Sequence, residues 1–153
     1  MKKYNFKEIC EFLDQTLVFG IKPSLDRIKM FLEILSHPER KVDFIHIVGT
    51  NGKTSTTKIT ASILNHHGLK SGYYISPHIY SYTERFSVCG KEINRNSFTD
   101  AFNEIVPFIR KVDSMDVGGR MTQFEILTAM MFYICFKEGL DVMVMEAGMG
   151  GRW

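Results

Sequence analysis

Residues 49–55 have the composition of a loop that holds phosphate groups. The segment Gly49-Thr50-Asn51-Gly52-Lys53-Thr54-Ser55 follows an apolar run and precedes a helix-forming stretch. Glycines let backbone N–H groups approach a phosphate, and the start of a helix adds unpaired donors and a favourable dipole. In this interpretation Lys53 reaches the β- and γ-phosphates, and Thr54 or Ser55 binds Mg²⁺. The alternative is an ordinary glycine turn with a solvent-facing lysine, which this sequence context disfavours.

The loop is shorter than the usual phosphate-binding loop, which has a glycine five residues before its Gly-Lys pair. Here that position is Ile47, inside the apolar run. The residues alone therefore leave open which nucleotide chemistry the loop serves.

Two further polar residues follow apolar runs and are candidates for metal binding. Glu146 ends the run Val142-Met143-Val144-Met145, where a carboxylate must be solvated, paired or bound to a metal. If Glu146 lies opposite a phosphate loop, metal binding is the favoured interpretation, because Mg²⁺ takes hard oxygen ligands and few of them from protein. The alternative is that Glu146 caps a helix beginning in the glycines after it. Ser76, before Pro77, is by itself more typical of a turn.

Composition excludes several classes of function. The chain has 153 residues, enough for one domain with its own core, and 19 basic against 17 acidic residues. This balance gives no support for a nucleic-acid or membrane partner. No apolar stretch is long enough to span a bilayer, and the first residues lack an apolar secretion segment. The three cysteines are scattered without metal or redox spacing, which favours a reducing cytoplasm.

Periodicity and turn signals predict alternating helices and strands. Helices are expected over 6–17, from Pro23-Ser24, and from Lys53 to Gly68. The second should have one apolar face, made of Leu25, Ile28, Phe31, Leu32 and Leu35. The third should have Ile59, Ile63 and Leu64 inward. Two more begin at the capping boxes Ser97–Asp100 and Thr122–Glu125, and Pro107 should kink or shorten the first of these. The later helix, over 126–136, is apolar nearly all round and therefore buried.

Strands are expected over 42–48, 71–75 and 141–145, with a hairpin around Cys89-Gly90. Strands alternating with helices predict an α/β fold, a parallel sheet flanked by helices. Each of the three strands ends in polar residues, and ligands of open α/β sheets bind at the carboxyl ends of strands. If the strands are neighbours, the phosphate loop, Ser76 and Glu146 converge on one crevice.

The sequence resembles the amino-terminal part of the folylpolyglutamate and dihydrofolate synthases, members of the Mur ligase superfamily. The matching segments cover nearly the whole chain in order: Phe19-Gly20 with Leu25–Ile28, Gly49–Lys53, Tyr74–His78 with Glu84–Phe86, Thr122–Glu125, and Glu146–Arg152. The short phosphate loop is that of this superfamily. The resemblance implies a P-loop nucleotide-binding fold like the Mur ligase central domain, incomplete at its carboxyl end.

The family's activity is implied in the same way. Such enzymes use ATP to convert a folate or dihydropteroate carboxylate into an acyl phosphate, which the amine of L-glutamate attacks. The resemblance implies that Gly49 to Ser55 hold ATP, with Lys53 catalytic, and that Thr54, Ser76 and Glu146 bind Mg²⁺. The folate or pterin would contact Phe19, Thr122, Gln123, Phe124, Glu125 and Arg152. Thr122 and Glu125 also suit a capping box, a role that needs no substrate.

Two departures from the family pattern bear on this interpretation. Thr54 stands where many folate-branch members have glycine, so either Thr54 or Ser55 is the expected metal ligand. The family chain also continues beyond Gly-Gly-Arg to a second metal site and a carboxyl-terminal glutamate-binding domain, so residues 1–153 correspond to a truncated ATP-binding domain. We expect the complete enzyme to be a cytoplasmic monomer and the fragment to self-associate through an exposed sheet edge. The alternative is a nucleotide-binding module, NTPase or small-molecule kinase without ligase activity.

Overall fold

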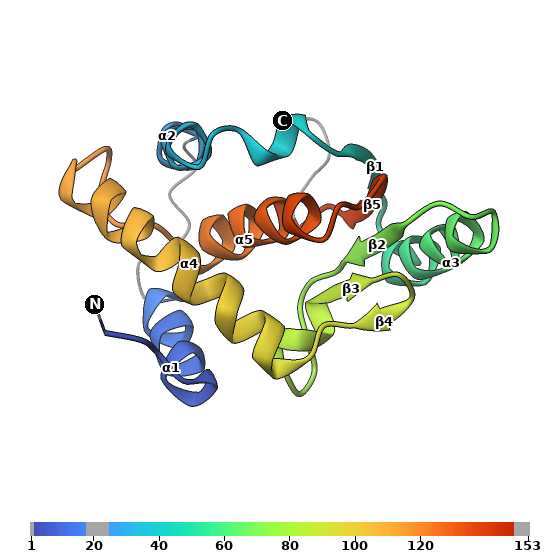
Figure 1. Ribbon diagram of the computed structural model, residues 1–153, viewed down its shortest axis with the longest axis horizontal. Helices are drawn as coiled ribbons and strands as arrows, with labels where there is room; N and C mark the ends of the chain where they lie inside the picture. Colours follow the sequence, from blue (N-terminus) through green and yellow to red (C-terminus); the bar gives the residue numbers. More distant parts are fainter. Residues whose placement is uncertain (1, 18–24, 149–153) are drawn as a thin grey trace. The chain divides into compact units, whose positions relative to one another are not determined.

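The computed structural model describes residues 2–17 and 25–148 and divides into two compact units (Figure 1). The described part of the helical unit comprises residues 2–17, 25–39 and 95–134, and that of the sheet unit comprises residues 40–94 and 135–148. No helix of these residues has both the length and the hydropathy needed to cross a membrane. Each unit is described by itself.

The sheet unit is built on a five-stranded sheet of order β1-β5-β2-β3-β4. The strands β1 (Asp43–Ile47), β5 (Val142–Glu146) and β2 (Ser71–Tyr74) are parallel, which confirms the predicted parallel core. The strands β3 (Phe86–Val88) and β4 (Lys91–Glu92) form the predicted hairpin around Cys89-Gly90 and pair antiparallel to β2. The whole sheet is therefore mixed.

Strand β5 lies between β1 and β2, and four of its five residues are buried. Strand β1 lies at the end of the sheet, where Asp43, Ile45 and His46 are exposed. Ile45 supplies an apolar side chain at this edge, but self-association of the chain stays a prediction.

Helix α3 (Lys53–His66) lies against this sheet, but not through the face that periodicity predicted. Ile59 and Ile63 are 60 % and 53 % exposed, so their predicted inward orientation is wrong. Thr57 and Ala61 are buried instead, about 200° around the helix from those two residues. The hydroxyl of Ser71 in β2 donates to the Ala61 carbonyl at 2.7 Å, which holds the small-residue face close to the sheet.

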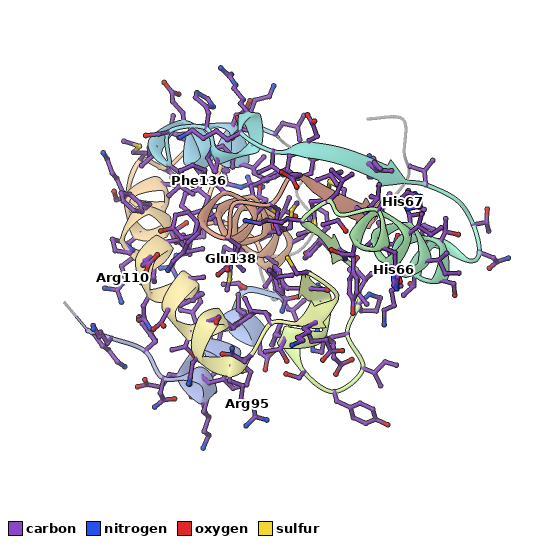
Figure 2. All side chains as sticks on the ribbon, turned by 45° about the vertical axis from the view of Figure 1, so that its right-hand side comes forward. His66, His67, Arg95, Arg110, Phe136 and Glu138 are labelled. Atoms are coloured by element: carbon purple, nitrogen blue, oxygen red, sulfur yellow. The ribbon has the colours of Figure 1, made fainter. Side chains whose placement is uncertain are left out.

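The end of α3 lies at the surface. Figure 2 shows His66 and His67 at this end, and both are exposed. Each Nδ1 contacts a backbone carbonyl four residues earlier, that of Ser62 at 2.8 Å and that of Ile63 at 2.9 Å. Gly68 follows with a positive φ of 87°, as expected for the residue after a helix.

The helical unit contains α1 (Phe6–Thr16), α2 (Asp26–Ile34), α4 (Arg95–Ser114) and the greater part of α5 (Gln123–Lys137), whose last residues belong to the sheet unit. Helix α1 begins with a capping box between Asn5 and Glu8. Two short 3-10 helices precede strands of the sheet: η2 (Pro38–Arg40) comes before β1, and η3 (Tyr82–Arg85) comes before β3. Apolar side chains of α1 and α4 form fully buried positions of the core, namely Ile9, Leu13, Phe98, Phe102, Ile105 and Ile109.

Some predicted details of this unit are wrong. Helix α4 begins at Arg95 rather than at the Ser97 box. It continues through Pro107 to Ser114, so the proline does not shorten the helix, and the alternative of a kink stays a prediction. In α2 the predicted burial of Phe31 and Leu32 is confirmed, whereas Leu25 is exposed at the N-cap and the charged Arg27 is buried instead. The buried stretch predicted for α5 is confirmed for most positions, although Phe136 at its end is exposed.

Gly72 sets how closely β2 and β3 approach each other. A Cβ at this position would lie 2.1 Å from the backbone oxygen of Ser87 in β3. We expect Gly72→Ala to lower the free energy of unfolding by about 3 kcal/mol or more, because the backbone of β3 must shift. Gly139→Ala is the control. An alanine is strained at the positive φ of 61° found there, but its Cβ would have no atom within contact distance. We expect this variant to lower the free energy of unfolding by about 1 kcal/mol. Equal losses in urea denaturation would contradict this account of Gly72.

Candidate active site

The phosphate-loop residues and Glu146 come together at the carboxyl ends of β1 and β5. Ile47 and Glu146 are register partners, and the Ala147 N–H donates to the Ile47 carbonyl at 2.9 Å. The loop that follows Ile47 therefore starts beside Glu146. Parallel pairing of two strands distant in sequence creates the site.

The start of α3 has unpaired donors toward this loop. Gly52 is its N-cap in the left-handed region, with a φ of 74°, and no side chain caps the first turn. Residues with a Cβ disfavour this backbone conformation, which glycine adopts readily. Uncapped N–H groups at a helix N-terminus are favourable partners for an anion such as phosphate.

Lys53 folds back over the loop. Its Nζ donates to the Gly49 carbonyl at 2.9 Å and contacts the Thr50 carbonyl at 3.5 Å. These carbonyls hold the ammonium group on the loop from which it would reach a bound phosphate. Lysine suits this role because its ammonium is a compact charge on a flexible stem.

Thr54 and Glu146 are in direct contact. The Thr54 hydroxyl donates to Oε2 of Glu146 at 2.7 Å, and the Glu146 residue is only 4 % exposed. Ser55 is the adjacent hydroxyl and is exposed. Of the two hydroxyls between which the sequence did not decide, Thr54 is the one in contact with Glu146, and its role as a metal ligand stays a prediction. A hydroxyl and a carboxylate are hard oxygen donors of the kind that Mg²⁺ prefers, so this pair fits a magnesium ion.

Ser76 lies at the same edge of the sheet. Tyr74 at the end of β2 pairs with Met145 of β5, and Ser76 follows two residues later, half-buried before a cis peptide bond to Pro77. The register thus brings Ser76 to the edge that carries Glu146.

The Glu84 carboxylate holds the loop that follows Ser76. Glu84 lies in a segment that resembles the family, but the sequence predicted no role for it. Its carboxylate accepts the backbone N–H groups of Ile79, Tyr80 and Ser81 at 3.0, 2.8 and 2.6 Å. These bonds, first that from Ile79, lower the pKa of Glu84. The signal was present in the sequence, because Ser81 and Glu84 have the spacing of a capping box.

His78 is fixed by the same segment. Its Nδ1 accepts a hydrogen bond from Nε of Arg85 at 2.9 Å, and its ring centroid lies 4.3 Å from that of Tyr82. The segment from Ser76 to Arg85 is therefore tied to itself at several points.

The stretch predicted to contact a pterin belongs to the helical unit, at the start of α5. The capping box of Thr122 and Glu125 is confirmed: the Thr122 N–H donates to Glu125 Oε2 at 2.8 Å, and the Glu125 N–H donates to the Thr122 hydroxyl at 3.3 Å. Buried Gln123 donates to the Leu13 carbonyl at 3.0 Å. Phe124 is 50 % exposed. The other predicted substrate residues, Phe19 and Arg152, lie outside the described residues.

The parallel strands, the glycine loop and the uncapped helix start have the arrangement of α/β nucleotide-binding proteins. No family model matches the chain. The dihydrofolate synthase/folylpolyglutamate synthase of Bacillus subtilis is 36 % identical over 149 residues, 97 % of this chain and 34 % of that protein. Folylpolyglutamate synthase of Mycobacterium tuberculosis, solved with ADP, aligns with a TM-score of 0.90 and 37 % identity over 97 % of this chain and 33 % of that one.

A folylpolyglutamate synthase solved with AMPPCP and folate aligns with a TM-score of 0.86 and 26 % identity, over 97 % of this chain and 36 % of that one. The chain is therefore homologous to part of the folylpolyglutamate/dihydrofolate synthases. It spans about a third of the length of these relatives.

The contact between Thr54 and Glu146 generates a first prediction for the site. Thr54→Val keeps the shape but leaves a buried carboxylate without this donor, so we expect unfolding to become easier by about 1–3 kcal/mol. Thr56→Val makes the same change at an exposed position of α3 and should stay within about 0.5 kcal/mol. Urea denaturation of the two variants is the measurement, and an equal effect would show that the hydrogen bond contributes nothing specific.

The lowered pKa of Glu84 generates a second prediction, for acid stability. Because the folded-state pKa lies below the ordinary value of 4.5, Glu84 stabilises the fold fully above that pH and less as the pH falls below it. The stability difference between the unmodified protein and Glu84→Gln should therefore shrink on acidification. Glu138→Gln, at an exposed carboxyl, is the control (Figure 2). A difference that stays constant down to pH 3 would contradict the anchoring role.

Proposed function

We propose that the chain is the ATP-binding part of an ATP-dependent ligase that adds L-glutamate to the carboxylate of a folate or dihydropteroate. The observation that carries this proposal is the contact of Thr54 with Glu146 beside an uncapped helix start, in a chain homologous to synthases of this activity. The relatives solved with ADP and with AMPPCP and folate support ATP and a folate as ligands. We place the enzyme in the cytoplasm, as a monomer without nucleic-acid or membrane partners.

The proposed reaction has two steps. The substrate carboxylate attacks the γ-phosphorus of ATP, giving an acyl phosphate and ADP. The amine of glutamate then attacks the acyl carbon, an amide forms, and phosphate leaves. Both steps depend on positioning and on neutralising phosphate charge.

The residues at the strand ends have complementary roles in this scheme. Backbone N–H groups from Gly49 to Ser55 hold the triphosphate, and Lys53 leaves the loop carbonyls to neutralise charge on the transferred phosphoryl group. Thr54, Ser76 and Glu146 hold Mg²⁺, which neutralises phosphate charge when bound. The buried position of Glu146 fixes its carboxylate before the nucleotide arrives.

The substrate side of the proposal centres on Phe124. The polar groups of Thr122, Gln123 and Glu125 have partners within the helical unit, so their structural roles are established without a ligand. Phe124 has the one half-exposed aromatic ring of this stretch, and we assign it to the pterin ring system. Phe19 and Arg152 remain in the proposal as substrate residues on the strength of the family resemblance.

ATP turnover in the complete enzyme tests the function. We expect consumption of ATP to require both the pterin substrate and glutamate, and Lys53→Ala to reduce it by about a thousandfold or more, since the variant loses the charge that stabilises phosphoryl transfer. Lys70→Ala removes an exposed lysine of the same unit and should leave turnover unchanged. ATP consumption that ignores glutamate would favour an NTPase or a kinase instead. Normal turnover by Lys53→Ala would contradict the assignment of the phosphate loop.

A further inference from the structure

Arg27 is a charged residue that the proposed reaction does not use and that is nevertheless 1 % exposed. It lies in α2, a helix whose inner face was expected to consist of apolar side chains. Arginine is seldom buried completely unless its guanidinium is paired. Its partners therefore indicate what the position requires.

The described partners of Arg27 lie at, or just before, the start of α5. Its Nε donates to both carboxylate oxygens of Glu125 at 3.1 Å, and its Nη2 lies 3.0 Å from Oε1 of the same residue. Its Nη1 donates to the Gly118 carbonyl at 2.8 Å. One planar group thus joins α2, the turn before α5 and the first turn of α5, an arrangement for which lysine has too few directed donors.

The turn that contains Gly118 is shaped to make this contact. Asp116, Gly118 and Gly119 all have positive φ, and a Cβ on Gly118 would lie 3.3 Å from Nη1 of Arg27. At the other end, Oε2 of Glu125 also accepts the N–H and the hydroxyl of Thr122, at 2.8 and 2.9 Å. The contacts of Arg27 therefore continue directly into the capping box on either side of Phe124.

We propose that Arg27 is a positioning residue for the pterin substrate: it fixes the first turn of α5 so that Phe124 faces outward in one orientation. This inference rests on the proposed function. A buried ion pair is weak evidence for added stability, because desolvation offsets much of its attraction. The geometry accounts for the position better, because the bonds to Glu125 and Gly118 fix the segment that carries Phe124.

The test compares Arg27→Lys with the unmodified complete enzyme. Lysine retains the charge but cannot hold Glu125 and Gly118 together, so the KM for dihydropteroate or a reduced folate should rise by at least about tenfold, while the KM for ATP stays within about twofold. Hydrogen exchange should become faster at the amides of residues 123–126. Arg110→Lys, the same change at an exposed arginine of α4, is the matched control and should leave all of these values unchanged.

A double variant separates positioning from stability. Arg27→Met with Glu125→Gln leaves no unpaired buried charge and keeps an acceptor for Thr122, so the melting temperature should recover relative to Arg27→Met alone. The raised KM for the pterin substrate should persist, because the tie to Gly118 is still missing. Recovery of that KM together with the melting temperature, or an unchanged KM in Arg27→Lys, would overturn the positioning role. If the unmodified enzyme uses no pterin substrate, the proposed function fails, and the role of Arg27 toward that substrate fails with it.

Discussion

The central physical constraint in the sheet unit is the parallel pairing of β5 between β1 and β2. This pairing places Glu146 beside the end of β1, although the two segments are about 100 residues apart in the chain. A carboxylate buried at that point needs a hydrogen-bond donor, and Thr54 at the start of α3 supplies it. The loop from Gly49 to Lys53 is thereby held between a strand end and a helix start, both of which are fixed by the sheet.

The sequence indicated this arrangement well because its signals are local. Apolar runs that end in glycine or polar residues predicted the three parallel strands, and the spacing of Gly49, Gly52 and Lys53 predicted the loop between β1 and α3. The capping box of Thr122 and Glu125 also formed as expected. Each of these features depends on neighbours within a few residues.

Features that depend on distant partners were harder to predict. Periodicity assigned Ile59 and Ile63 to the inner face of α3, whereas contact with the sheet is made through Thr57 and Ala61. Nothing within α2 shows that Arg27 is buried, because the carboxylate that makes its burial possible is 98 residues away. The hydrogen bond between Thr54 and Glu146 likewise joins residues 92 positions apart, so the sequence did not show which of Thr54 and Ser55 contacts that carboxylate.

The loop anchored by Glu84 has a consequence for how this surface can change during evolution. Glu84 holds Ile79, Tyr80 and Ser81 through their backbone N–H groups, which every amino acid except proline possesses, while the side chains of Ile79 and Tyr80 point into solvent. The shape of the loop is therefore largely independent of the side chains at positions 79 and 80. Lineages can vary these two residues, and with them the surface offered beside the site, without rebuilding the segment that carries Ser76 and His78.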